Sequence, residues 1–333
     1  MFIHLAWDLN RSAIKSSRSL LTGFILVIAF LLSACGGGGG DGDGGNNFNL
    51  DGGAVTGSFD PNSTAVPATY SFNVVAGTPY TVSLVNTSGD TALYVFADDP
   101  ITNPNATVIG ISWTDGIYEN VSFIADYTGT VYALPLGTTL SATTYTIEAT
   151  TNRLTVGAPA RTDATYGGGG LFTTDLFYSF EAQAGVAYEV RVVPTQGNVD
   201  LMRVTPNSDM TGSVGSSANP GTTPDSVFFT AAATQRYYIR VDGTGVDSIF
   251  GISVHEVPAG PDLSVAIDNA VSDGSNVILD YTIYNNGADD YTGDVLVDLW
   301  ADAATAPGVG LTGDDFVTHT GVTITGLGGS KYG

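Results

Sequence analysis

Apolar and polar residues alternate with a period of two along most of the chain after residue 50. Tyr80, Val82 and Leu84 alternate with polar neighbours, and the same pattern returns around Val190 and Val192. This period is typical of β-strands buried on one face. Ala-Gly pairs at 76–77 and 184–185 fall between such runs, where a hairpin turn favours a residue that tolerates positive φ. Helical periodicity is absent, so the sequence predicts an all-β fold.

The strand pattern occurs twice. Tyr70-Ser-Phe and Tyr178-Ser-Phe are offset by 108 residues, Phe123 and Phe229 by 106, and Tyr145 and Phe250 by 105. An offset that drifts by so little indicates two copies of one domain, with small loop deletions in the second. Seven or so short strands in about 100 residues predict an antiparallel β-sandwich of the jelly-roll or immunoglobulin-like type for each copy.

The repeated residues resemble the bacterial pre-peptidase C-terminal domain. The resemblance rests on Tyr-Ser-Phe, on Ala-Gly followed by Tyr-x-Val, and on the later Leu, Phe and Tyr positions. It implies β-sandwiches at residues 50–152 and 153–257, of a kind found beside secreted peptidases and in other extracellular proteins. The family's aspartate-leucine pair is present as Asp200-Leu201, but Ala92 replaces the aspartate in the first copy.

A different pattern follows Pro258 to Pro261. This region has three strand-like runs, a Pro-Asp-Leu that opens at Pro261 and an Asn-Asn-Gly that ends at Gly287. With these features it resembles the CARDB group of adhesion-related, immunoglobulin-like bacterial modules. That family is longer than residues 261–333. We therefore expect an incomplete β-domain with an exposed edge strand.

The first 35 residues predict export. Three basic residues precede an apolar run of 13 residues, Leu20 to Leu32, which is shorter than the ~20 residues of a membrane-spanning helix. Leu32-Ser-Ala-Cys35 resembles the lipobox of bacterial lipoproteins, which implies that Cys35 is acylated and becomes the N-terminus. Gly36 in place of aspartate favours the outer membrane. The alternative is a short signal anchor that stays attached. Residues 36–49 are rich in glycine and predict a flexible tether.

Charge and cysteine content exclude several classes of protein. The formal net charge is −23, and removal of residues 1–34 would leave 7 bases against 32 acids. So few cations argue against nucleic-acid binding. A single cysteine excludes a disulfide framework and a cysteine-ligated zinc site.

Catalytic motifs are lacking. His255-Glu256 begins like a zinc-protease motif, but Pro258 would break the required helix. His319 lies in a polar β-run with no partner nearby in the sequence, and no nucleophile elbow occurs. We expect no enzymatic activity.

Calcium is the one cofactor that the acidic loops suggest, because calcium prefers oxygen ligands. No loop has a complete ligand spacing, so solubility and turn hydrogen bonding are the favoured interpretation of the same residues. Trp113 is a candidate for stacking on a sugar, with core packing as the alternative. The candidate calcium ligands are Asp98, Asp99, Asp200, Asp289, Asp290, Asp314 and Asp315.

The sequence favours a lipid-anchored array of non-catalytic binding or adhesion modules in the bacterial cell envelope. Its expected partners are the membrane, through Cys35, and an extracellular protein or polysaccharide. One competing hypothesis is an accessory region of an exported peptidase or other hydrolase whose catalytic domain lies outside this sequence. Another is a purely structural stalk.

Overall fold

The computed structural model consists of β-strands and connecting loops. Every regular element in the described ranges is a strand, which confirms the predicted all-β class. Among the strand pairs whose register is described, all are antiparallel except the short parallel pair of β1 and β3. No helix in this part of the chain is long and apolar enough to cross a membrane. Cys35 and most of the predicted tether lie outside the described residues, which are 46–63, 67–114, 116–138, 141–167, 175–243, 247–272, 277–299 and 315–332.

Contacts divide the chain into two compact units, and each is described by itself. One comprises residues 1–152, 165–177 and 243–247, and the other comprises residues 153–164, 178–242 and 248–333.

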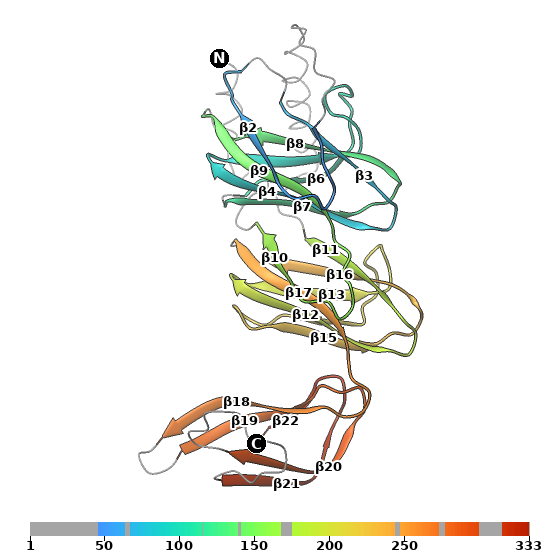
Figure 1. Cartoon of the computed structure of the whole chain (residues 1–333), viewed down its shortest axis with the longest axis vertical. Coiled ribbons are helices and arrows are strands. Elements are labelled where there is room, and N and C mark those ends of the chain that lie inside the picture. Colours follow the sequence, from blue (N-terminus) through green and yellow to red (C-terminus); the bar gives the residue numbers. More distant parts are fainter. Residues whose placement is uncertain are drawn as a thin grey trace, which may run out of the picture. The chain divides into compact units, whose positions relative to one another are not determined.

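The first sandwich has a five-stranded and a four-stranded sheet (Figure 1). The sheet orders are β1-β3-β8-β5-β6 and β2-β9-β4-β7. The core between them includes Leu84, Leu93 and Ile147, none of which is exposed. The strands are β1 (Asn46–Asn47), β2 (Val55–Phe59), β3 (Tyr70–Val74), β4 (Pro79–Ser88), β5 (Thr91–Phe96), β6 (Val108–Ser112), β7 (Tyr118–Ile124), β8 (Gly129–Gly137) and β9 (Thr143–Thr151).

The second sandwich repeats this topology. Its sheets have the orders β11-β16-β13-β14 and β10-β17-β12-β15, which match the first sandwich strand for strand apart from β1. The register is also repeated, because Tyr80 pairs with Phe123 and Tyr188 pairs with Phe229. The strands are β10 (Arg161–Tyr166), β11 (Leu176–Ala182), β12 (Ala187–Gln196), β13 (Val199–Thr205), β14 (Gly215–Ser217), β15 (Asp225–Thr230), β16 (Gln235–Gly243) and β17 (Ser248–Glu256).

The hairpin glycines have the conformation that the sequence predicts. Gly77 and Gly185 adopt φ values of 74° and 78°, which L-residues with side chains rarely adopt. Beside each turn a tyrosine hydroxyl, of Tyr80 or Tyr188, accepts the backbone N–H five residues earlier at 3.0 and 2.9 Å. The same turn is thus built twice from the same residue types.

The remaining strands form two small sheets, β18-β19-β22 and β20-β21. β18 is an edge strand, on which Val265 and Ile267 are 46% and 62% exposed. Their paired residues on β19, Ile283 and Tyr281, are buried. The strands are β18 (Leu263–Ser272), β19 (Val277–Asn285), β20 (Tyr291–Leu299), β21 (Asp315–Ile324) and β22 (Gly329–Tyr332).

Candidate functional site

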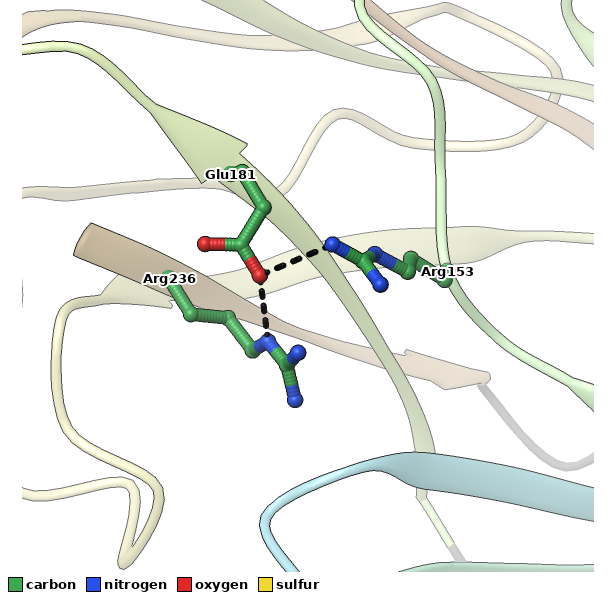
Figure 2. Close-up of polar contacts among 3 residues, drawn as sticks. All are labelled: Arg153, Glu181 and Arg236. Carbon is green, nitrogen blue, oxygen red and sulfur yellow. Dashed lines mark hydrogen bonds and ion pairs between the residues drawn. The ribbon is translucent and has the colours of Figure 1, made fainter. Parts of the chain in front are cut away.

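Three charged side chains meet on the second sandwich (Figure 2). Glu181 on β11 accepts hydrogen bonds at one oxygen, Oε1, from Arg153 Nη2 at 3.1 Å and from Arg236 Nε at 2.9 Å. Because alternate residues of a strand face opposite sides, Glu181 points outward while its neighbours Phe180 and Ala182 are buried. The arginine and glutamate side chains are 25–53% exposed, and such surface pairs add little stability. Their structural effect is to fix the direction of the two arginines.

A surface hollow of about 480 Å³ lies beside Arg236. One wall is the loop between β13 and β14, and the other is the start of β16. The residues around it are predominantly polar or charged: Pro206, Asn207, Ser208, Asp209, Thr211, Gln235, Arg236 and Tyr238.

The loop wall is held by hydrogen bonds within the loop. Asp209 Oδ1 accepts the backbone N–H of Thr211 at 2.9 Å and its hydroxyl at 2.6 Å. These bonds, the one from the hydroxyl first, lower the pKa of Asp209. Asn207 Nδ2 donates to the Thr211 carbonyl at 2.9 Å, and Arg203 donates to the carbonyl of Met210. The hollow therefore has a fixed carboxylate on one side and a fixed guanidinium on the other.

The first sandwich has a neutral pair at the equivalent position. Thr130 on β8 donates to Asn73 Oδ1 on β3 at 3.1 Å, where the second sandwich has Arg236 and Glu181. Basic residues are distributed in the same unequal way, because residues 36–152 contain no lysine or arginine and residues 153–240 contain six arginines. The two copies thus share a framework and differ in surface charge.

Two of the calcium candidates make hydrogen bonds within their own loop. Asp99 accepts the N–H of Ile101 and the hydroxyl of Thr102, both at 2.9 Å. Asp98 accepts the N–H of Thr107 at 3.3 Å. The contacts of Asp99 are the turn bonding that the sequence also allowed, whereas the contact of Asp98 joins two ends of the loop nine residues apart.

The other calcium candidates are spread over the chain. Asp200 accepts Asn198 Nδ2 at 3.0 Å, and burial raises its pKa. Asp290 accepts the N–H of Gly326 at 3.0 Å, and the adjacent Asp289 is in the same loop. Within the described ranges, no three His, Cys, Asp or Glu residues are placed to hold a metal ion. Asp314 lies outside these ranges, and Asp315 begins β21 with no side-chain position described.

A buried carboxylate in the first sandwich was not anticipated from the sequence. Glu119 on β7 has no exposed surface and accepts the Ser112 hydroxyl at 2.6 Å and the Thr114 N–H and hydroxyl at 3.0 and 2.8 Å. Burial raises the pKa of Glu119 to about 7, and Asp90 contributes in the same direction. The hydrogen bonds act the other way because they favour the charged form.

The second sandwich repeats this feature with an aspartate. Asp225, also fully buried, accepts the Ser217 hydroxyl at 2.6 Å and the Asn219 N–H at 2.8 Å. Asp225 follows Glu119 by 106 residues, the offset that separates Phe123 from Phe229. An acid at the same repeat position in both copies was the signal that could have revealed the pair.

Trp113 and the histidines have structural surroundings. Trp113 is half-buried and packs against an apolar cluster that includes Tyr94 and Phe96. His319 Nε2 lies 2.5 Å from the hydroxyl of Tyr281, a partner 38 residues away. His255 is half-buried on β17 and pairs with Glu189 of β12.

Comparison with known proteins identifies one domain. Residues 174–243 match the bacterial pre-peptidase C-terminal domain, and this range contains the hollow, Glu181 and Arg236. No curated protein matches the chain.

Two solved structures are similar to parts of the chain. One is the pre-peptidase C-terminal domain of a collagenase from Bacillus anthracis, with 17% identity and a TM-score of 0.25 over 31% of this chain and 90% of that one. The other is a protein described as secreted, from Parabacteroides distasonis, with 8% identity and a TM-score of 0.17 over 60% of this chain and 88% of that one.

The family match defines the class of residues 174–243. They form a pre-peptidase C-terminal domain, a non-catalytic module of secreted bacterial proteins. This assignment fits an extracellular location and an accessory role for that part of the chain.

Proposed function

We propose that this chain is an exported, lipid-anchored surface protein whose modules bind an extracellular ligand without catalysis. The supporting observation is the contrast between the two sandwiches, which share strand order and turns but carry different groups at one surface position. Glu181 and Arg236 replace Asn73 and Thr130 there. A constant framework with variable surface groups is typical of binding modules.

The family match favours a second candidate function, an accessory region of an exported peptidase or other hydrolase. In that case the modules would bind or position the substrate of a catalytic domain outside these 333 residues. Both candidates assign binding to the sandwiches, and they differ in whether an enzyme is attached.

The anchoring part of the proposal is tested by replacing Cys35 in a bacterium that processes lipoproteins. The wild-type chain should incorporate labelled fatty acid and partition into detergent, because several acyl chains hold a protein stably on a membrane. Cys35→Ser should lose the label and stay unprocessed or soluble. Ser33→Ala, which retains Cys35, is the matched control. A Cys35→Ser chain that still fractionates with membranes as mature protein would refute lipidation.

The binding part is tested with the same cells. Cells that display the chain should retain soluble extracellular polymers from their own culture, and cells without the chain should not. Equal retention by both would refute a binding role.

A further inference from the structure

We propose that the hollow between the β13–β14 loop and the start of β16 binds a neutral glycan. The inference rests on the proposed binding function, because it names the ligand class of that function. Its first support is the placement of charge, with Asp209 in the loop wall and Arg236 at the start of β16. An anionic ligand would face the carboxylate, and a cationic ligand would face the guanidinium.

The hydroxyl groups of a sugar suit both walls. They donate hydrogen bonds to a carboxylate and accept them from a guanidinium, and bonds to charged groups are the stronger kind. Figure 2 shows that Arg236 contacts Glu181 through Nε, with its terminal amino groups beyond that nitrogen. The guanidinium thus keeps a fixed direction from its bond to Glu181.

Neutral polar groups also line the hollow. The amides of Asn207 and Gln235 each offer a donor and an acceptor, and the Thr211 hydroxyl, which donates to Asp209, offers an acceptor. A ligand with many hydroxyl groups can satisfy such a set, whereas an apolar ligand would leave it unpaired at a cost. The lining therefore favours a carbohydrate over an apolar molecule.

Both walls are organised in the structure as it stands. Thr211 holds Asp209, while Glu181 holds Arg236 and is itself held by Arg153. Side chains that are already ordered lose less entropy when a ligand binds. This supports binding at a shallow surface site without a large apolar contact.

The first sandwich provides an internal comparison. Gly129 and Thr130 occupy the positions of Gln235 and Arg236, so that copy lacks the amide and the guanidinium on the same strand. Because the framework is the same, the polar wall is not required for folding.

The test is titration of the processed full chain, in detergent, with fluorescent neutral hexasaccharides of glucose (β-1,4 and β-1,3), mannose and N-acetylglucosamine. Hexagalacturonate and hexaglucosamine serve as anionic and cationic probes. At least one neutral probe should bind, and Asp209→Asn and Arg236→Gln should each weaken that binding by about tenfold or more, since each removes a charged hydrogen-bond partner. Arg191→Gln, which removes an exposed arginine from the other sheet, should bind as wild type.

Three results would overturn the inference: no neutral probe binds, a charged probe binds most tightly, or both wall variants bind as wild type. Thermal melts check that each variant is folded, and they should match wild type. If Asp209→Asn or Arg236→Gln melts early, Asp209→Ser or Arg236→Lys is used in its place. Retention of extracellular polymers without binding of the neutral probes would reject this inference and leave the proposed function standing. Loss of retention would reject the proposed function itself.

Discussion

Replacing Glu119 by glutamine removes an ionisable group from the interior of the first sandwich while keeping the size of the side chain. The wild-type carboxylate has no exposed surface, and residues 36–152 contain no lysine or arginine to pair with it. Hydrogen bonds from Ser112 and Thr114 compensate only part of the cost of burying the charge. In the variant the new amide can donate to the Ser112 hydroxyl oxygen, so the local bonds have a replacement.

The magnitude follows from the pKa of Glu119, which burial raises from 4.5 to about 7. In this pH range the folded form holds a proton that the unfolded chain releases. Stability therefore falls as pH rises from 4.5 towards 7 and is level above that, a loss of ~3 kcal/mol at ~1.4 kcal/mol per pKa unit. Glu119→Gln should lack this loss. It should match wild type near pH 4.5 and be more stable by about 2–3 kcal/mol at pH 8.

Trp113 provides the assay because it lies beside Thr114, a partner of Glu119. In the processed chain with Trp300→Phe, it is the remaining tryptophan, and urea unfolding followed by its fluorescence reports on the first sandwich. Asp126→Asn is the matched control, because it removes an exposed acid from the same sandwich. If wild type and Glu119→Gln lose stability in parallel between pH 4.5 and 7, the reasoning from burial is wrong.

Two further predictions concern the whole chain. Limited proteolysis should cut first near 36–49 and 258–262, because Gly and Pro interrupt the strand pattern there, and should leave a resistant fragment near 50–257. Early cuts within 70–95, seen on a gel, would contradict the first sandwich. The purified chain should release no product from casein or common polysaccharides, with or without calcium, and turnover abolished by replacing His255 or His319 would show an enzyme instead.

Local features of the fold were predictable from the sequence. The period-two pattern defines which strand residues face the core, and a hairpin turn needs positive φ at positions such as Gly77 and Gly185. Both depend on residues close together in the chain, and the repeat supplied the evidence twice. Contacts between distant strands were not predictable in this way.

The Glu181–Arg236 pair shows why contacts between distant strands could not be predicted. Glu181 and Arg236 are 55 residues apart and meet only because β11 and β16 are neighbours in the sheet. Periodicity indicates that each side chain faces outward but not which outward residue lies across from it. His319 and Tyr281 are a second case, because β19 and β21 belong to different sheets. Strand order has to be known before such pairs can be proposed.

Buried acids and exposed polar pairs, which both occupy matching positions in the two sandwiches, are under different physical constraints. A buried acid such as Glu119 or Asp225 must keep its hydrogen-bond donors, because an unpaired buried charge destabilises the fold strongly. Exposed pairs such as Thr130–Asn73 or Arg236–Glu181 contribute ~1 kcal/mol or less, so they can be exchanged without loss of the fold. Both copies keep an acid with a serine donor at the interior position and differ at the exposed one. Removing a donor from an interior acid should therefore destabilise the fold, whereas the exposed charges of the second sandwich can vary without loss of the fold.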